Sequence, residues 1–291
     1  MNLPARPSLG PLGRSISAEA LAASRCDASL LFPIARAPQR AALGGDGSGS
    51  LPFAAGADVW TAYELSWLNM RGKPQVAIAH IAVDCRSTNI IESKSLKLYL
   101  NSYSECRFAS AKEVHARMVR DIAAAASPGA PHLVHALLAP PDEFAHQTVR
   151  ELAGINLDAL DIECPPLPAP APELLYADFA APPVEETLAS HLLKSHCPVT
   201  GQPDWASVQI MYRGAPIAHE GLLRYIISWR QHSGFHEHCV EQIFCDIHAR
   251  CRPQHLRVYA RYCRRGGIDI NPWRSSDANA APPTAARTAR Q

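Results

Sequence analysis

Apolar and polar residues follow regular patterns in two blocks of this chain, about 59–163 and 184–275. In each block, strand-like apolar runs alternate with amphipathic stretches of helical period. The segments are 75–84, 95–103, 111–126 and 132–138 in the first block, and 207–214, 221–231, 236–251 and 255–262 in the second. Each block is predicted to contain a strand, a helix pair and further strands, which makes an α+β fold with an antiparallel sheet.

The two blocks match each other at a nearly constant distance along the chain. Glu113 corresponds to Glu237, 124 residues later, and His132 corresponds to His255, 123 residues later. Chance matches of short segments do not usually keep their offset over four elements. The pattern therefore indicates a diverged tandem repeat.

Three segments outside the blocks differ from them in composition. Residues 1–58, rich in Ala, Pro, Gly and Ser, are expected to form a partly flexible N-terminal extension, with a flexible loop at 44–50, GGDGSGS. The stretch 164–183 is rich in proline, which favours an extended connector over helix or sheet. The tail at 276–291 is expected to be disordered.

Charge and hydropathy narrow the class of protein. The chain has 291 residues, of which 47% are hydrophobic and 19% are charged, with 28 Lys and Arg against 27 Asp and Glu. This balance argues against a dedicated nucleic-acid or anionic-membrane binder, which needs clustered excess cations. No apolar run approaches the roughly 20 residues of a membrane helix, and the N-terminus lacks the apolar segment of a secretory signal. We expect a soluble, cytoplasmic protein.

The nine cysteines contain no CxxC pair. An odd number in a chain of this length is unlike a secreted disulfide framework. Most of these cysteines are therefore expected to be reduced, buried, small apolar side chains.

The segment SHCPVTGQPDW, at 195–205, is a candidate nucleophile site. Cys197 lies in a loop stiffened by Pro and Gly, before a predicted strand. A cysteine thiol is mostly protonated at neutral pH, and the carboxyl of Asp204 is of the right type to move its proton. The alternative is that Cys197 is one more buried cysteine and Asp204 a turn former.

The segment GFHEHCVEQIFC, at 234–245, places His236 and Glu237 at the start of a predicted helix. A carboxylate there either compensates the helix dipole or accepts hydrogen bonds from ring N–H groups of a ligand. Nearby side chains also form a candidate zinc set, namely His236, His238, Cys239, Cys245 and His248. Their spacing matches no closed tetrahedral pattern.

Two further segments carry candidate anion sites. Ser93 and Lys94 follow Glu92 before an amphipathic run, where hydroxyls and an ammonium group can receive a phosphate; the alternative is a capped, solvated helix start. Arg265 precedes Gly266 in YARYCRRGGIDINPWRS, at 259–275, which is either an anion site or a charged turn. No GxGxxG nucleotide fingerprint accompanies them.

Taken together and in this order, these four segments resemble 7-cyano-7-deazaguanine reductase, the NADPH-dependent nitrile reductase of queuosine biosynthesis. CDASLLFPIAR at 26–36 and DVWTAYELSWLN at 58–69 resemble its longer, two-module form. The likeness covers most of residues 14–275. It implies two tandem tunnelling-fold (T-fold) modules, at 59–163 and 184–275, with paired helices on one face of an antiparallel sheet, and a homodimer.

The resemblance also implies a reaction. The nitrile of 7-cyano-7-deazaguanine would be reduced to the primary amine by two NADPH, through a covalent thioimide on Cys197, with Asp204 as proton donor and no metal. The substrate-binding positions that match the family are Ile91, Glu92, Ser93, His236 and Glu237. The matching NADPH positions are Ser93, Lys94, Arg265 and Gly266.

Two other functions are compatible with the residues alone. One is a zinc-dependent, cyclohydrolase-like enzyme of the same fold, which would use His236, His238 and Cys239. The other is a non-catalytic binder of nucleobases or tRNA, although the near-zero net charge argues against direct contact with nucleic acid.

Overall fold

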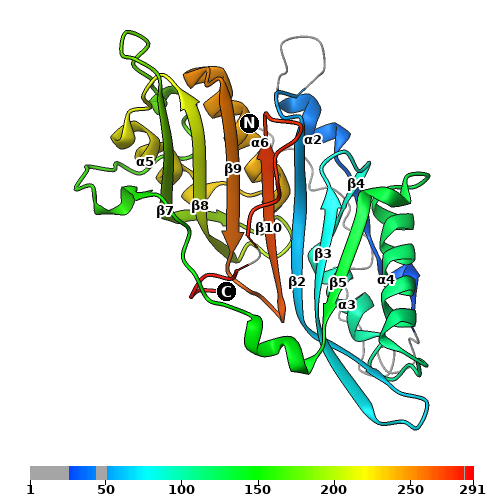
Figure 1. Ribbon diagram of the computed structural model, residues 1–291. Coiled ribbons are helices and arrows are strands. Elements are labelled where there is room, and N and C mark those ends of the chain that lie inside the picture. Colours follow the sequence, from blue (N-terminus) through cyan, green and yellow to red (C-terminus); the bar gives the residue numbers. More distant parts are fainter. Residues whose placement is uncertain (1–25, 44–50, 285) are drawn as a thin grey trace.

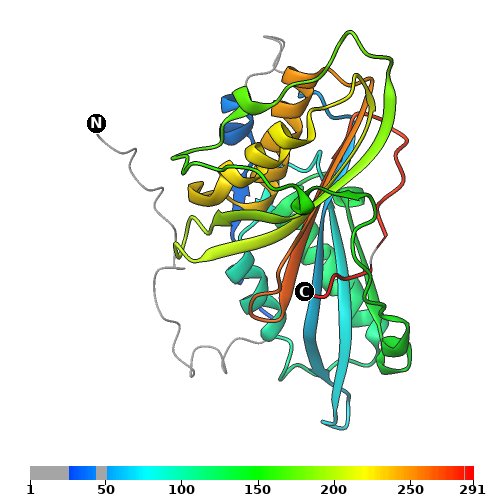
Figure 2. The same ribbon diagram turned by 90° about the vertical axis from the view of Figure 1, so that its left-hand side faces the viewer.

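One eight-stranded sheet forms the body of the protein, and the long helices pack on one of its faces (Figures 1 and 2). The computed structural model describes residues 26–43, 51–284 and 286–291. The strand order is β5-β3-β2-β10-β9-β8-β7-β6, and all neighbours are antiparallel except β6 and β7. The α+β composition and the antiparallel sheet are as the sequence predicts.

The first half of the chain forms a long hairpin, two helices and an edge strand. These are β2 (Ala55–Leu68), β3 (Pro74–Asp84), α3 (Ser93–Asn101), α4 (Ala111–Ala126) and β5 (Val134–Ala139). The start of α4 is set locally, because the Ser110 hydroxyl accepts from the N–H of Glu113 while the Glu113 carboxylate accepts from the N–H of Ala109. The helix predicted at 111–126 is confirmed.

The second half repeats this order and adds one strand. Its elements are β7 (Val184–His196), β8 (Pro203–Gly214), α5 (His219–Ser228), α6 (His236–Cys251), β9 (His255–Tyr262) and β10 (Ile268–Ser275). The segments predicted at 236–251 and 255–262 coincide with α6 and β9. Both long hairpins also shift register at matching places, between Ala62 and Leu65 and between Ser190 and Leu193.

The last strand, β10, joins the two halves. It pairs with β9 on one side and with β2 on the other, so the halves share one continuous sheet (Figure 1). Its Ile268 and Ile270 pack in the core of the first half, although they belong to the second block of the sequence. All eight of its residues are buried. Its sequence, IDINPWRS, alternates apolar and polar residues at 268–271, but the polar residues are buried as well, because both faces of the strand are covered.

Four buried charged side chains and the half-buried Arg40 meet at the junction between the halves. Arg274 on β10 donates to Asp58 on β2 at 2.8 Å and to Glu241 on α6 at 2.7 Å. Arg36 also pairs with Asp58, and Arg40 pairs with Glu241 at 2.6 Å. Burial alone would raise the pKa of both carboxyls, but the arginines outweigh it and hold both pKa values below normal. Three cations against two anions leave the cluster one positive charge in excess.

The N-terminal segment is part of the fold where it is described. β1 (Pro33–Ala35) pairs with β4 (Asn89–Ile91), and the short helix α2 (Ala37–Ala42) follows it. Treating all of 1–58 as a separate extension was wrong, because 26–43 packs on the first half and β2 begins at 55. The loop expected to be flexible at 44–50 lies outside the described residues.

The boundary expected between the modules also differs. β6 (Ile155–Asn156) pairs with β7, and Leu157 packs in the second core, so the first half ends before 155 rather than at 163. The stretch 164–183 contains no strand or α-helix, as expected. It nevertheless lies against the second core through Leu175 and Ala177.

The C-terminal tail is ordered against the open face of the sheet, so the prediction of a disordered tail was wrong. The buried guanidinium of Arg261 on β9 donates to the side-chain oxygen of Gln291 and to the carbonyl of Ala286. Gln291 itself donates to Tyr262 O at 3.0 Å. A buried guanidinium needs acceptors, and the tail supplies them.

Two cysteines depart from the expected reduced state. Cys26 and Cys106 form a disulfide, with 6.6 Å between their Cα atoms, and the other seven cysteines are free. Across the ranges that the structure describes, no helix is long and apolar enough to cross a lipid bilayer.

Candidate active site

A cavity of about 330 Å³ opens where the two halves meet. Four segments line it: the junction of β4 and α3, the loop between β7 and β8, the start of α6 and the turn between β9 and β10. All of the site residues predicted from the sequence lie on its wall, namely Ile91, Glu92, Ser93, Lys94, Cys197, Asp204, His236, Glu237, Arg265 and Gly266. Their placement together is a result of the fold, because they come from both halves of the chain.

Cys197 is the first residue of the six-residue loop between β7 and β8. Its N–H donates to Gln202 O at 2.9 Å, and its carbonyl accepts from Gly201 N at 2.8 Å. Gly201 has a φ of +69°, which suits a residue without a side chain. The thiol is partly exposed toward the cavity, unlike the buried free cysteines such as Cys239 and Cys245. It is therefore accessible to a ligand.

Asp204, near the start of β8, is buried and contacts two side chains, the guanidinium of Arg265 and the imidazole of His236. Its Oδ1 accepts from Arg265, and its Oδ2 lies 3.1 Å from His236 Nε2. Burial by itself would raise the pKa of Asp204, but the hydrogen bonds and charges of His236 and Arg265 outweigh it and lower the pKa below normal. The His236 ring is stacked on Tyr262 at 3.7 Å between centroids. Asp204 is thus held ionised at neutral pH.

Glu237 is a buried carboxyl that lacks a hydrogen-bond partner on one oxygen. It lies one turn before Glu241 on α6, is 2% exposed, and its Oε1 has no partner among the described residues. Burial and the charge of Asp58 raise its pKa to about 8, against the opposing effect of Arg36 and Arg274. A buried acceptor without a donor is costly. Its position on the cavity wall suits a ligand with N–H groups.

The start of α3 contributes a capped turn. The Glu92 carboxylate accepts from Ser95 N at 2.8 Å and is 1% exposed, so this helix start is capped as the alternative predicts, but Glu92 is not solvated. Ser93 and Lys94 follow it on the cavity wall, and Lys97 lies one turn further along. Neither lysine forms a salt bridge with any described carboxylate. Two unpaired ammonium groups at one end of a cavity fit a phosphate-bearing ligand.

The turn between β9 and β10 closes this end of the cavity. Gly266 has a φ of +59°, and a Cβ on it would lie 2.6 Å from Lys97 Nζ, so a side chain would disturb the lysine. Arg265 extends from the same turn to Asp204 and Gln202. The geometry thus places Arg265 between the carboxyl and the cationic end of the cavity.

Comparison with known proteins gives the family. A profile described as "Nitrile reductase, 7-cyano-7-deazaguanine-reductase N-term" matches residues 23–130, and one described as "QueF-like protein" matches residues 203–281. A protein of Verminephrobacter eiseniae named NADPH-dependent 7-cyano-7-deazaguanine reductase is 58% identical over 287 residues, which is 98% of this chain and 99% of that one. A protein of the same name from Polaromonas sp. strain JS666 is 55% identical over the whole of both chains. The chain belongs to the 7-cyano-7-deazaguanine reductase family.

The similarity to this family covers both halves, since the two profiles match one half each. Among solved structures, an apo archaeosine synthase described as QueF-like is 18% identical, with a TM-score of 0.30, over 35% of this chain and 99% of its own. A likeness at this level adds nothing about the fold.

Sequence reasoning missed some residues on the cavity wall. Trp60 on β2, Phe235 before α6, and Gln202 in the Cys197 loop all line it. Lys97, which the sequence indicates as a further cation after Lys94, lines the cavity as well. Phe235 and Gln202 lie next to predicted site residues, which was the available signal. Nothing local marked Trp60, because its place at the cavity depends on the pairing of β2 with β10.

The zinc alternative finds no support in the arrangement of its ligands. Over the described ranges, no group of three or more His, Cys, Asp or Glu side chains is gathered as a metal ion requires. His236 is directed to Asp204, and His238 packs at the edge of the Phe235 ring. The donors that this alternative needs do not converge.

Proposed function

We propose that this protein reduces the nitrile of 7-cyano-7-deazaguanine to the primary amine 7-aminomethyl-7-deazaguanine, with NADPH as hydride donor. Membership of the family supports this, since relatives that cover the whole chain carry the name of that activity. The observation that carries it for this chain is a single cavity with an accessible thiol, an ionised carboxylate and a buried unpartnered carboxyl, from Cys197, Asp204 and Glu237.

The first step would be addition of Cys197 to the nitrile. The sulfur forms a bond to the nitrile carbon, one C–N π bond breaks, and the nitrogen takes a proton. Asp204 is suited to move this proton, because its lowered pKa keeps it ionised and able to accept from the thiol before it donates to the nitrogen. The product is a thioimide, whose carbon accepts hydride more readily than the nitrile carbon does.

Two hydrides then complete the reduction. NADPH supplies each hydride, and each addition is matched by one proton at nitrogen. After the first hydride the nitrogen lone pair would form a C=N bond and expel Cys197 as the thiolate; nitrogen then loses one proton, the thiolate regains one, and an imine is left. The second hydride gives the amine. Asp204 and its partner His236, which both line the cavity, would supply these protons.

Recognition of the two substrates divides between the ends of the cavity. Glu237 would accept hydrogen bonds from the pyrimidine edge of the deazaguanine, beside Ile91, Glu92 and His236. Ser93, Lys94, Arg265 and Gly266 would bind NADPH at the cationic end, where the ammonium and guanidinium groups suit its phosphates. The residues present therefore fit both ligands.

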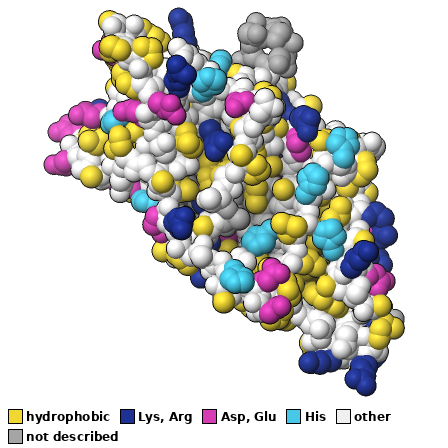
Figure 3. Space-filling model, viewed as in Figure 1, with side chains coloured by type: hydrophobic (Ala, Val, Ile, Leu, Met, Phe, Trp, Pro, Cys, Tyr) yellow, Lys and Arg dark blue, Asp and Glu magenta, His cyan; other side chains and the backbone are white. Residues whose placement is uncertain are grey.

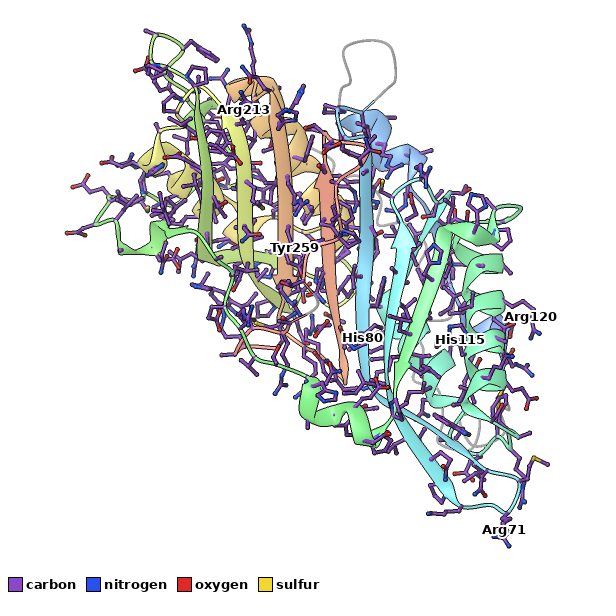
Figure 4. The ribbon with its side chains drawn as sticks, in the orientation of Figure 1. Arg71, His80, His115, Arg120, Arg213 and Tyr259 are labelled. Atoms are coloured by element: carbon purple, nitrogen blue, oxygen red, sulfur yellow. A yellow bond between two sulfur atoms is a disulfide. The ribbon has the colours of Figure 1, made fainter. Side chains whose placement is uncertain are left out.

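The proposal includes the finer architecture. We assign the two hairpin–helix–helix–strand halves to tandem T-fold modules, supported by their common element order and matching register shifts. The open face of the sheet carries hydrophobic and histidine side chains (Figure 3), with Tyr259 and His80 labelled on it in Figure 4. Leu137 on the edge strand β5 is 72% exposed. These features support a homodimer, whose mass light scattering measures directly.

The deciding experiment is intact-protein mass spectrometry after mixing with 7-cyano-7-deazaguanine in the absence of NADPH. The wild type should gain the mass of one substrate, and Cys197→Ala should gain none. Cys164→Ala is the matched control, because Cys164 is an exposed cysteine away from the cavity and its loss should leave the adduct intact. Addition of NADPH should then release the amine. Absence of a wild-type adduct under saturating ligand would refute the covalent mechanism.

A further inference from the structure

The loop that carries Cys197 has few contacts with the core. Its residues 197–202 are half-buried or exposed. Within the loop, Cys197 is hydrogen-bonded to residues 201 and 202, and Gln202 N donates to Thr200 Oγ1 at 3.3 Å. Such a loop does not hold a side chain in one place without further support. One support is Arg265, which donates to the side-chain oxygen of Gln202, and the other is the residue just before the loop, His196.

The ring of His196 makes two hydrogen bonds in which the donor and the acceptor can be assigned. Its Nδ1 lies 3.1 Å from Gly201 O, and its Nε2 lies 3.1 Å from Lys194 Nζ. An ammonium group has only donors, so Nε2 must be the acceptor and the proton must be on Nδ1. That proton is then donated to the carbonyl of Gly201. The contact with Lys194 therefore favours the Nδ1–H tautomer of His196, and this tautomer donates a hydrogen bond to the Gly201 carbonyl near the end of the Cys197 loop.

Lys194 is itself held in place. Its Nζ donates to Arg230 O at 3.1 Å and lies 5.9 Å from the centre of the Trp205 ring. Trp205 is opposite Lys194 in the pairing of β7 with β8, and the Arg230 guanidinium also lies over its ring, at 5.4 Å. The ammonium thus has two independent contacts besides His196.

The backbone of His196 binds a second catalytic segment. Its N–H donates to His232 O at 2.8 Å, and its carbonyl accepts from Gly234 N at 3.1 Å. Residues 232–234 lead directly into α6, which begins at His236 and presents Glu237. One residue is therefore hydrogen-bonded both to the nucleophile loop and to the segment that positions the substrate carboxyl.

We propose that His196, held by Lys194 as its Nδ1–H tautomer, is a positioning residue that sets Cys197 relative to the start of α6. His196 does not line the cavity and needs no contact with substrate. The effect that we expect on the rate of thioimide formation rests on the proposed function. Its structural consequence, a loop fixed through the Gly201 carbonyl, holds independently of the reaction.

The test compares His196→Ala, His196→Asn and Lys194→Met with the wild type. Asn keeps an N–H donor near the position of Nδ1, and Met keeps most of the Lys stem without its charge. His132→Ala and Lys73→Met are the matched controls, because both residues are exposed and lie away from the cavity. Thioimide formation is timed by quenched mass spectrometry at saturating nitrile, and the nitrile Kd is measured with Cys197→Ala added to each variant.

Misplacement of a reacting group by about 1 Å costs on the order of 100-fold in rate. We therefore expect His196→Ala to form the adduct roughly 10- to 100-fold more slowly, with a Kd within about threefold of the reference. His196→Asn should recover much of the rate, and Lys194→Met should fall between. Equal rates in all variants would overturn the proposal, as would a loss of affinity that matches the loss of rate.

Amide hydrogen exchange provides the readout that needs no nitrile. In His196→Ala and Lys194→Met, faster exchange should be confined to 195–204 and 232–236. Faster exchange over the whole chain would indicate general destabilisation and contradict a positioning role. If the wild type forms no adduct while the local exchange changes as expected, the proposed function fails and the structural role of His196 stands.

Discussion

Replacing Arg265 by Met tests whether this guanidinium sets the ionisation of Asp204. Arg265 contacts Oδ1 of Asp204, which is only 4% exposed, while His236 remains on Oδ2. A cation in contact with a carboxyl lowers its pKa by roughly 1–3 units. The Arg265 side chain is 38% exposed, so solvent screening favours the lower end, about one pH unit or ~1.4 kcal/mol.

The sign of the effect follows from the form that reacts. The ionised carboxylate accepts the thiol proton of Cys197, so the rate of adduct formation falls as the pH drops through the pKa of Asp204. Removal of Arg265 raises that pKa, and the acid limb of the rate profile should move about one unit to higher pH. At a pH well above the limb, variant and wild type should react at similar rates.

The assay is single-turnover thioimide formation at saturating nitrile from about pH 2.5 to pH 7, a range that extends below the normal pKa of an aspartate, followed by quenching and intact-protein mass spectrometry. NADPH is left out, so a weakened cofactor site in Arg265→Met does not affect the result. Arg264→Met is the control, because Arg264 is in the same turn but lies over the Tyr63 ring, 4.8 Å from its centre. An acid limb that stays in place in Arg265→Met, or moves to lower pH, would refute the reasoning.

Glu237→Gln should raise the nitrile Kd roughly 10- to 100-fold, because a charge-assisted hydrogen bond contributes about 1.5–3 kcal/mol. In the wild type, calorimetry should show affinity falling as the pH drops below about 8, where Glu237 gains a proton; the variant should lose this dependence. Arg274→Met should lower the free energy of unfolding by about 3–5 kcal/mol in urea titrations, because it leaves buried Glu241 short of a partner. Gln291→Ala should lower it by about 1–3 kcal/mol, because buried Arg261 loses an acceptor.

Matched controls separate these effects from nonspecific ones. Glu220→Gln changes an exposed carboxyl and should leave nitrile affinity unchanged. Arg86→Met breaks a surface pair with Asp84 and should cost less than about 1 kcal/mol. Gln254→Ala removes an exposed amide and should have little effect on unfolding. If a variant changes nitrile affinity or the free energy of unfolding no more than its control does, the buried contact assigned to that residue does not contribute as argued.

Local patterns were sufficient for the elements whose boundaries are set by neighbouring residues. The helix at 111–126 is capped by Ser110 and Glu113, and its buried Val114, Met118 and Ile122 recur at helical spacing. The residue types at the cavity were also visible, because a thiol, carboxyls and cations occurred in short distinctive segments. These features depend on a few adjacent residues, and a sequence shows them directly.

Longer-range features were not predictable in this way. The tail was expected to be disordered from its composition, yet Arg261, thirty residues before Gln291, holds it on the sheet. The burial of the polar residues of β10, such as Asp269 and Arg274, also had no local signal, because it depends on what covers the two faces of the strand. Likewise, no local signal showed that Arg265 would contact Asp204 rather than remain free at the cationic end of the cavity.

The sequence by itself determined the two repeating blocks, the class of fold, the chemistry of the side chains and the family. The tertiary structure alone decided that β10 joins the halves, that the cavity lies at their junction, and that Asp204 and Glu237 have pKa values shifted in opposite directions. The physical reason is that periodicity and capping act over a few residues. Burial and charge pairing instead depend on which distant segments pack together.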